Sequence, residues 1–339
     1  MTTTDTQNRP LHSLRLSVTD RCNLRCQYCM PETDYVWLKR AALLNFEEID
    51  RLINVFSRAG IERVRITGGE PLLRRDLQAL IQLISAKDKI KDLALTTNGV
   101  LLASQAKTLK TAGLHRVTVS LDTLRPDRFL SLTKGDFHHQ VVNGIDAAAA
   151  TFGGLKIDTV VIKNVNQDEL VQMIEFGKKR NAEVRFIEYM DVGGATKWSM
   201  SSVVPRTEIL QILSKHYDQI LPISDTTSAP ADRFALSDGT SFGIISSTTV
   251  PFCHSCDRSR ITADGIWYLC LYATQGEDLR QSLRSGLSDN EILNQIKSSW
   301  KNRTDEGAKD RLKEERREAF VSLKLLRQDS HLEMHTRGG

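Results

Sequence analysis

Six short segments in the first two thirds of the chain alternate large aliphatic residues with polar ones, and a helical pattern follows each. Such alternation over about four to eight residues predicts a strand. The strands are expected at 14–18, 64–67, 93–96, 117–122, 160–163 and 184–190, and the helices at 46–59, 76–85, a segment ending at 112, 141–151, 168–179 and 207–215. Alternating strands and helices give parallel strands joined by right-handed crossovers. Six units predict an α/β fold with an incomplete (βα)6 TIM-like barrel rather than the complete eightfold one.

The polar face of these strands carries several basic residues. In each of the first five strands the large aliphatic residues share one face, which we expect to pack against the helices. The opposite face holds Arg15, Arg65, Thr96, Ser120 and Lys163, and Arg185 has the same place in the sixth strand. A packed barrel interior is filled by Val, Ile and Leu, so this pattern predicts an open, cationic interior. The alternative is that single charges lie at strand ends in solvent.

The rest of the chain divides by composition. Residues 1–10 are polar and offer little to bury, so they predict a disordered tail. Residues 11–221 would form the barrel, and residues 222–339 a C-terminal domain. That domain opens with a stretch rich in Ser, Thr, Pro and Asp, 222–240, which is typical of a linker or a long surface loop. Strands are expected at 241–247 and 265–271, an amphipathic helix at 287–300, and a solvated charged segment at 301–318.

Composition is that of an ordinary globular protein: 339 residues, 40% hydrophobic and 26% charged. No apolar run approaches the length of a membrane span, and the N-terminal residues lack the apolar region of a signal peptide. We therefore expect a cytoplasmic protein without membrane contact. The net charge of +4 suits an anionic small-molecule substrate and is too weak to indicate nucleic acid.

Three of the six cysteines, Cys22, Cys26 and Cys29, lie in one short segment directly after the first predicted strand. Without a secretory signal, such close spacing indicates metal ligands rather than disulfides. An iron–sulfur cubane has four iron corners, so three thiolates leave one corner open for a substrate or cofactor. The alternative is a zinc site whose fourth ligand comes from elsewhere in the chain.

The other three cysteines, Cys253, Cys256 and Cys270, form a second group. A zinc ribbon would need a fourth ligand, and His254 is too close to Cys253 to supply it easily. A second cluster with one open iron is the sharper interpretation. Arg258 and Arg260 follow at alternate strand positions, so their side chains point the same way. Guanidinium pairs suit phosphate oxygens, although most such pairs are simply solvated.

A Gly-Gly-Glu-Pro stretch, Gly68–Pro71, follows the second predicted strand. This loop and the first cysteine group therefore share the C-terminal rim of the barrel, where βα loops build active sites. Glycines let the backbone approach a ligand closely, and Glu70 offers a carboxylate to a ligand amine. Alone, the stretch is only a turn, but beside three thiolates it predicts a ligand clamp.

These motifs resemble those of the radical S-adenosylmethionine superfamily, whose signature is CxxxCxxC with an aromatic residue, here Tyr28, before the last cysteine. The second cysteine group, the pair Arg258 and Arg260, and the terminal Gly338-Gly339 narrow the resemblance. Together they are similar to the GTP 3′,8-cyclase family of molybdenum cofactor biosynthesis, over the chain from Leu14 to Gly339. Arg337 stands where an aliphatic residue is expected, and Asn164 where a glycine is more usual.

The resemblance implies a role for each matching residue. Cys22, Cys26 and Cys29 would hold a [4Fe–4S] cluster whose open iron binds the amino and carboxylate groups of S-adenosylmethionine, with cofactor contacts from Tyr28, Gly69, Ser120 and Met190 and with Glu70 near the methionine amine. Cys253, Cys256 and Cys270 would hold an auxiliary [4Fe–4S] cluster whose open iron meets the guanine base. GTP would be bound by Arg15, Arg65, Thr96, Lys163, Arg185, Arg258 and Arg260. Catalysis would involve Arg258, Arg260 and a tail, Gly338 and Gly339, that reaches into the active site.

The implied reaction is the first step of molybdenum cofactor biosynthesis. One electron would cleave S-adenosylmethionine into methionine and a 5′-deoxyadenosyl radical, which would take the hydrogen atom from C3′ of GTP. The ribose radical would attack C8 of guanine, and uptake of one electron and one proton by the cyclised radical would give (8S)-3′,8-cyclo-7,8-dihydroguanosine 5′-triphosphate. The resemblance also implies an electron donor of the flavodoxin or ferredoxin type, cyclic pyranopterin monophosphate synthase as the downstream partner, and a homodimer.

Two other functions are compatible with parts of the sequence. Another radical S-adenosylmethionine enzyme with an auxiliary cluster, such as a peptide modifier, would need a peptide-recognition segment, and none is evident outside the barrel. A zinc-ribbon module that binds RNA through its arginines would be supported by aromatic residues among the basic ones. Only Phe252 and Trp267 lie near that group.

Overall fold

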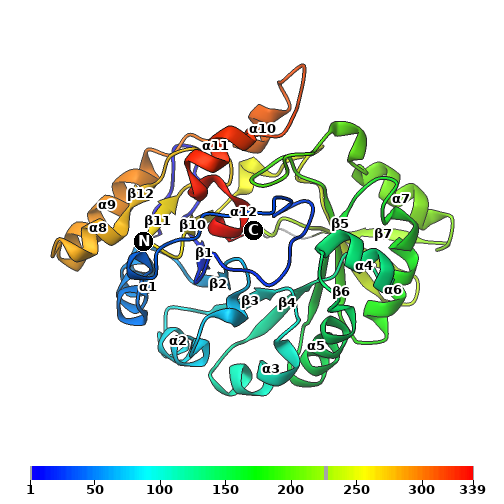
Figure 1. Cartoon of the computed structure of the whole chain (residues 1–339), viewed down its shortest axis with the longest axis horizontal. Helices are drawn as coiled ribbons and strands as arrows, with labels where there is room; N and C mark the ends of the chain where they lie inside the picture. Colours follow the sequence, from blue (N-terminus) through cyan, green and yellow to red (C-terminus); the bar gives the residue numbers. More distant parts are fainter. Residues whose placement is uncertain (1, 225–227, 339) are drawn as a thin grey trace.

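The structure, a computed structural model, describes residues 2–224 and 228–338 and contains the six predicted strand–helix units. The strands are β1 (Ser13–Ser17), β2 (Arg63–Thr67), β3 (Asp92–Thr97), β4 (Arg116–Ser120), β5 (Lys156–Val161) and β6 (Glu183–Glu188). The helices are α1 (Phe46–Ala59), α2 (Leu77–Ser85), α3 (Leu102–Thr111), α4 (Pro126–Thr133), α5 (His138–Thr151), α6 (Leu170–Lys178) and α7 (Arg206–Ser214). All neighbouring pairs from β1 to β6 are parallel, and the helices surround them (Figure 1).

The C-terminal part of the chain extends this sheet at both ends. β9 (Ser241–Ile245) pairs in parallel with β6, and β10 (Arg258–Ile261) pairs in parallel with β1. Antiparallel strands continue the sheet, with β8 (Asp232–Leu236) and β7 (Ile220–Ile223) at one end and β11 (Ile266–Tyr268) and β12 (Glu277–Asp278) at the other. The result is an open sheet of twelve strands with eight adjacent parallel strands at its centre. The incomplete barrel is confirmed, and β9 and β10 are the elements that complete its walls.

The expected linker at residues 222–240 is wrong, because β8 lies within it. Phe234 and Leu236 are buried at alternate positions of that strand, and the Phe234 ring stacks on Phe242 of β9 with 5.3 Å between ring centroids. The abundance of Ser, Thr, Pro and Asp in the first half of the stretch hid this pattern. Strands from both sides of residue 221 belong to one sheet. The predicted domain boundary at residue 221 therefore stays a prediction.

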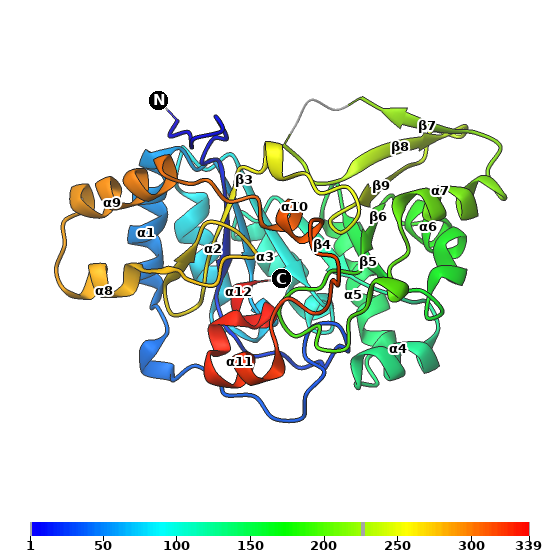
Figure 2. The same ribbon diagram turned by 90° about the horizontal axis from the view of Figure 1, so that it is seen from above.

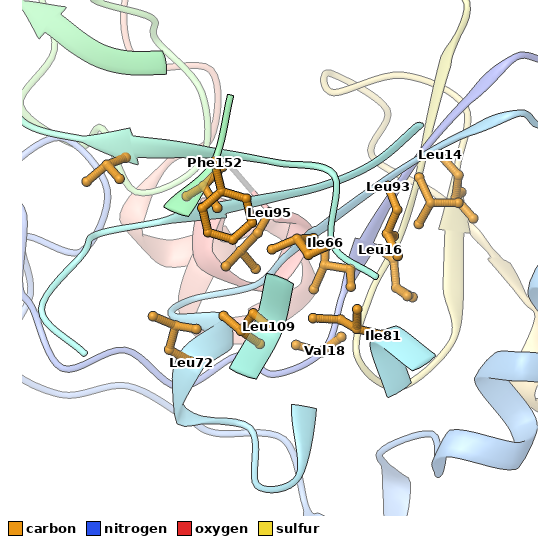
Figure 3. Packing of buried hydrophobic residues seen from close by; sticks show 14 of the residues in the cluster. Leu14, Leu16, Val18, Ile66, Leu72, Ile81, Leu93, Leu95, Leu109 and Phe152 are labelled. Carbon is orange, nitrogen blue, oxygen red and sulfur yellow. The ribbon is translucent and has the colours of Figure 1, made fainter. Parts of the chain in front are cut away.

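The residues that begin helices and fill the core follow the predicted patterns. Asn45 caps α1, and its side chain and that of Glu48 form a reciprocal capping box. Figure 3 shows the aliphatic side chains of β1, β2 and β3, among them Leu16, Ile66 and Leu95, packed together with side chains of α2 and α3. The outward face of the strands is therefore the hydrophobic core, which leaves the inward face for the site.

The N-terminal residues are packed rather than disordered, so the predicted tail at 1–10 is wrong for residues 2–10. Thr3, Asp5 and Arg9 are buried, and the backbone N–H of Leu11 donates to the carbonyl oxygen of Thr3 at 2.8 Å. Their burial is compatible with polarity because each side chain is hydrogen-bonded or ion-paired. Composition alone could not show those partners.

The charged segment at 301–318 is likewise only partly solvated. Arg303 and Arg311 are buried, and Arg311 Nε donates to Asp191 Oδ2 at 2.8 Å. Arg317 Nε donates to the same Asp191 oxygen at 2.9 Å. The expectation of a fully solvated segment is wrong because buried carboxylates far away in the sequence receive these arginines.

The last helices bring the C-terminus back to the centre of the molecule. They are α8 (Leu279–Arg284), α9 (Asp289–Lys301), α10 (Gly307–Arg311), α11 (Leu323–Gln328) and α12 (Met334–Arg337). Figures 1 and 2 both place α12 and the C-terminal mark near the middle of the molecule. In the described part of the chain, no helix is both long enough and apolar enough to cross a membrane.

Candidate active site

One cavity of about 770 Å³ lies inside the barrel and is lined by both cysteine groups. The inward faces of β1 to β6 supply most of its wall, and the loops after the strands supply the cysteines. The predicted open interior is confirmed, since Arg15, Arg65, Thr96, Ser120 and Arg185 all line this cavity. The two thiol groups, more than 220 residues apart in sequence, therefore face a single space.

The first cysteine group is held in a tight turn. The backbone N–H groups of Cys29 and Met30 both donate to the carbonyl oxygen of Cys26, at 3.0 and 2.7 Å. Asn98, from the loop after β3, directs its Nδ2 toward Cys22 Sγ at 3.8 Å. Burial raises the pKa of the Cys22 thiol to about 11, and burial also raises that of Cys26. In the protein alone these thiols stay protonated, so binding a metal here would release protons.

Gly68 and Gly69 bring the loop after β2 against the loop that carries the first cysteines. The Gly69 N–H donates to Thr19 O at 2.8 Å, and a Cβ at Gly69 would lie 2.5 Å from Arg21 O. Gly68 has a φ of 151°, which disfavours other residues. The glycines are therefore required by the close approach of two backbones, in addition to lining the cavity at Gly69.

The second cysteine group lies beside the start of β10 and lines the cavity. Cys253 begins a 3-10 turn, η5 (Cys253–Ser255), and Cys256 ends it. Arg258 Nη2 approaches Cys256 Sγ at 3.6 Å, and the N–H of Tyr272 donates to Cys270 Sγ at 3.4 Å. Burial opposes ionisation of Cys256, but Arg258 and Arg303 outweigh it and lower the pKa of this thiol to about 7. Burial raises the pKa of Cys253, and raises that of Cys270 to about 11, so Cys256 is the most readily ionised thiol of this group.

Both groups fit an iron–sulfur cluster by the chemistry of their donors. All six cysteines are free thiols, and each group offers three of them to the cavity. Within residues 2–224 and 228–338, no three His, Cys, Asp or Glu side chains converge on a point that one metal ion could occupy. A cubane does not need such a point, since each thiolate binds its own iron corner. Soft thiolate donors suit iron–sulfur clusters.

A row of arginines crosses three neighbouring strands in the wall of the cavity. Arg260 of β10 is in register with Arg15 of β1, and Arg15 is in register with Arg65 of β2. Burial and Arg15 lower the pKa of Arg65 to about 9, while burial and Arg258 lower that of Arg260 to about 10. Among the described residues, no carboxylate forms an ion pair with Arg65, Arg258 or Arg260. Their mutual repulsion would be relieved by an anion in the cavity.

Two of the predicted GTP-binding residues differ from this row. Arg185 lines the cavity but is paired with Asp158, with Nη2 and Oδ1 2.7 Å apart. Lys163 does not line the cavity. In β5 the even-numbered residues Lys156, Asp158 and Val160 face the cavity, so the odd-numbered positions face outward. The Lys163 ammonium instead pairs with Glu208 at 3.0 Å. The predicted inward position of Lys163 is wrong, because the alternation of inward and outward residues in this strand is shifted by one residue from the predicted one.

The C-terminal tail contacts two residues of the cavity wall through Gly338, and its entry into the active site stays a prediction. Its carbonyl oxygen accepts from Arg260 Nη1 at 2.9 Å and from Arg15 Nη1 at 3.3 Å. Arg337 holds this end of the chain, since its Nη1 donates to the carbonyl oxygens of Leu271 and Ala273 at 2.9 and 2.7 Å. The predicted role of Gly339 falls outside the described residues.

The residues expected to contact S-adenosylmethionine face the cavity that the first cysteine group also lines, with one exception. Tyr28, Gly69, Ser120 and Met190 all line the cavity. The Tyr28 hydroxyl donates to Asp122 Oδ2 at 2.7 Å, which fixes the ring. Glu70 is fully buried behind the wall, and its carboxylate accepts from Thr97 Oγ1, Leu72 N and Asn98 N. Burial raises its pKa to about 7. Because Glu70 does not line the cavity and its carboxylate accepts these three bonds, it supports the loop in this structure.

Sequence reasoning missed several residues of this site. Asn98 and Asp122 follow β3 and β4 at the same rim as Gly69. The rule that the loops after barrel strands build the active site would have indicated both residues. Asp158 faces inward beside Arg185 and could have been found only with the correct phase of β5. His335 lines the cavity from α12, and nothing in the sequence around it indicated this position.

Comparison with known proteins finds relatives over nearly the whole chain. The Radical SAM superfamily is matched over residues 16–177, and Molybdenum Cofactor Synthesis C over residues 182–309. GTP 3′,8-cyclase 3 of Mycobacterium bovis is 53% identical over 340 residues, covering 99% of this chain and 90% of the relative. GTP 3′,8-cyclase of Aquifex aeolicus is 42% identical over 337 residues, covering 99% of both chains.

A solved structure shares the fold at lower identity. Streptococcus suis SuiB bound to S-adenosylmethionine superimposes with a TM-score of 0.61 at 14% identity, covering 86% of this chain and 69% of that one. This likeness supports the partial barrel and says nothing further about chemistry. The identity and coverage of the relatives decide the family: this chain belongs to the GTP 3′,8-cyclases of the radical S-adenosylmethionine superfamily.

Proposed function

We propose that the cavity is the active site at which this chain, a GTP 3′,8-cyclase of molybdenum cofactor biosynthesis, binds and cyclises GTP. The observation that carries the assignment is that the arginine row Arg260–Arg15–Arg65 lines the same cavity as two groups of three thiols. An anionic nucleotide bound along this row would lie between the two groups. No peptide-binding segment or exposed RNA-binding surface is needed to explain this arrangement.

Membership of the superfamily implies a [4Fe–4S] cluster and S-adenosylmethionine. Cys22, Cys26 and Cys29 would hold that cluster. When bound, the pair supplies the one-electron reductive cleavage that yields a 5′-deoxyadenosyl radical. The protein's part is placement: Tyr28, held by Asp122, and the wall formed by Gly69, Ser120 and Met190 would fix the cofactor beside the open corner.

A second [4Fe–4S] cluster would be held by Cys253, Cys256 and Cys270. Arg258 and Arg303 already favour the thiolate of Cys256, which is the form that binds iron. The guanine base would face this side of the cavity. GTP would thereby be fixed at both ends, with its base toward the second group and its ribose toward the first.

The triphosphate would be bound by Arg15, Arg65, Arg258 and Arg260. Each guanidinium can donate two parallel hydrogen bonds to phosphate oxygens. Arg65 is oriented by Thr96 and Thr118, whose hydroxyl oxygens accept from its Nη1 at 3.1 and 3.2 Å. Arg185 would also contact the triphosphate, although its ion pair with Asp158 restricts the movement of its side chain. Fixing the triphosphate in this way would present C3′, rather than C4′ or C5′, to the radical.

The chain would also help to exclude water from the site. Met334 and His335 of α12 form part of the cavity wall. Gly338 is held by Arg260 and Arg15, which are also phosphate-binding candidates, so the tail and substrate would share these donors. A closed cavity would protect a radical from quenching.

The proposal includes partners outside the chain. The electron would come from a carrier of the flavodoxin or ferredoxin type, and the product would pass to cyclic pyranopterin monophosphate synthase. We also propose a cytoplasmic homodimer.

The direct test is anaerobic incubation of the reconstituted protein with GTP, S-adenosylmethionine and a chemical reductant, followed by mass analysis of the nucleotide. We expect a product isomeric with GTP together with 5′-deoxyadenosine. The double variant R258A/R260A should retain both clusters and form no cyclised nucleotide. Unchanged turnover in that variant would contradict the assignment of the arginines.

A further inference from the structure

The N-terminal segment Thr3–Arg9 is built as a tight loop against the back of the second cysteine group. Thr3 Oγ1 donates to the carbonyl oxygen of Ala59 at the end of α1, at 2.9 Å. Asp5 Oδ1 accepts from the backbone N–H groups of Gln7 and Arg9, at 2.9 and 2.8 Å. These bonds give the segment a defined shape and turn the Arg9 side chain inward.

Arg9 connects this loop to Cys253. Its Nε donates to Asp5 Oδ2 at 2.6 Å, and the two side chains are 1% and 0% exposed. Its Nη1 donates to the carbonyl oxygen of Cys253 at 3.0 Å and to that of Asp305 at 2.8 Å. Burying an ion pair costs desolvation free energy, which is offset only when the pair has good geometry and makes further hydrogen bonds. Here Nη1 of the guanidinium donates to the backbone of a cysteine and of the segment behind it, while Nη2 has no hydrogen-bond partner among the described residues.

Arg303 makes the matching contact at the other end of the turn. Its Nη1 donates to the carbonyl oxygen of Cys256 at 2.9 Å, and its Nη2 lies 3.1 Å from Asp305 Oδ1. Its guanidinium stacks over the Trp300 ring at 4.5 Å, and Trp300 Nε1 donates to the carbonyl oxygen of Arg9 at 3.0 Å. The two arginines are therefore linked through Trp300, and they donate hydrogen bonds to the carbonyl oxygens of Cys253 and Cys256, at the two ends of the turn.

We propose that Arg9 and Arg303 are positioning residues for the auxiliary cluster: they fix the Cys253–Cys256 turn and so set the stability and reduction potential of the cluster. The inference rests on the proposed function, which places that cluster on Cys253, Cys256 and Cys270. Partners of this kind behind metal ligands typically change metal affinity about 10–100-fold when removed. Cluster potentials also depend on nearby charge.

The experiment isolates the auxiliary cluster in the full-length chain. The variant C22S/C26S/C29S, reconstituted with iron and sulfide, should carry only the second cluster. Into it we would introduce R303M, and separately D5N/R9M, which removes both members of the buried pair and so leaves no unpaired carboxylate. R128M is the matched control, because Arg128 is largely buried and is ion-paired with Asp168 and Glu169, not with Asp5, Asp305 or the second cysteine group.

We expect iron release to a ferrous chelator to be about tenfold or more faster in R303M and in D5N/R9M than in the parent, and unchanged in R128M. The reduction potential of R303M should fall, because a positive charge beside Cys256 is lost. R303K should lie between R303M and the parent, since an ammonium retains the charge but not the fork of donors. A purely structural role would not move the potential.

Two results would overturn the inference in distinguishable ways. If R303M and D5N/R9M release iron at the parent's rate with the parent's potential, Arg9 and Arg303 do not position the cluster, and the proposed function stands. If the parent itself binds no iron, the second cluster does not exist, and the proposed function and the inference both fail. To exclude misfolding, the same substitutions in C253S/C256S/C270S should leave the first cluster's iron content unchanged, and loss of that iron would also count against a specific role.

Discussion

Arg15 and Arg260 are in register on neighbouring parallel strands, and both donate to the carbonyl oxygen of Gly338. The pairing exists because β10 returns to lie beside β1 after almost the entire barrel has been built. A residue of the C-terminal tail is thereby held by two arginines from opposite parts of the sequence. The last described residue of the tail is therefore placed by direct contact with two arginines of the cavity wall, which are proposed GTP-binding groups.

This contact predicts that G338A is severely impaired. Gly338 has a φ of 69°, which costs another residue about 1–2 kcal/mol, and an added Cβ would overlap Thr67 Cγ2. We expect cyclisation to fall by at least about tenfold, with S-adenosylmethionine binding retained. The measurement is turnover of GTP together with equilibrium binding of the cofactor.

The double variant G338A/T67S tests the steric cause. Serine lacks Cγ2, and the next nearest Thr67 atoms would lie 3.5 Å from the added Cβ, an ordinary contact. Part of the lost activity should return. If G338A is fully active, or if the double variant is no better than G338A, the tail is not placed by this contact.

The arginine row predicts a specific defect in R65M. Arg65 is held by two threonine hydroxyls and has no carboxylate partner among the described residues, so its charge is available to a phosphate. A hydrogen bond to a charged group is worth about 1.5–3 kcal/mol. We expect the KM for GTP to rise about 10–100-fold, with iron content and cofactor binding unchanged. R51M is the control, since Arg51 pairs with Asp289 outside the cavity. An unchanged KM in R65M would remove Arg65 from the GTP site.

The barrel could be predicted because its signals are local. Alternation and helical periodicity give β1 to β6, and the cysteine spacing and the rim rule give the first metal group. The prediction of Lys163 failed since Val160, Val161 and Ile162 are all aliphatic, and a run of that kind has no readable phase. In the structure Val160 faces the cavity and Val161 the core.

Other features could not be predicted since they depend on contacts between distant segments. No local pattern shows that β10 pairs with β1, so the row Arg260–Arg15–Arg65 is visible only in the fold. The N-terminal segment looked disordered because its buried charges, Asp5 and Arg9, satisfy each other and distant backbone groups. A polar segment is expected to be exposed only when no hydrogen-bonding or ion-pairing group from a distant part of the chain lies beside it.

The two cysteine groups predict two separable iron sites. Each offers three thiols, so C253S/C256S/C270S should lose about half of the iron of the reconstituted protein, and C22S/C26S/C29S should lose the other half. Iron and sulfide analysis under anaerobic conditions measures this directly, with the absorption spectrum as a check. Zinc in the second group, or loss of all iron from either triple variant, would contradict two independent clusters.

The last prediction concerns His331, which fastens the tail segment to the turn after β10. His331 Nε2 lies 2.8 Å from Asp264 Oδ2, and Nδ1 lies 2.9 Å from Asp329 Oδ1. The hydrogen bond with Asp264 is the larger cause that raises the pKa of His331 above its ordinary 6.5. Below 6.5 the ring is protonated in both the folded and the unfolded chain, so the stabilisation is fully present. It is lost as pH rises through the raised folded pKa.

This sign gives a test that separates the two carboxylates. Asp264 is 4% exposed and Asp329 is 45% exposed, so solvent screens the second pair more strongly. NMR titration of the labelled imidazole should therefore show a larger fall in the pKa of His331 in D264N than in D329N. Proteolysis of the C-terminal segment should accelerate as pH rises through the pKa of the wild type. In H331Q, which cannot titrate, that acceleration should be absent. An equal or larger fall in D329N would mean that the buried carboxylate is not what holds the tail.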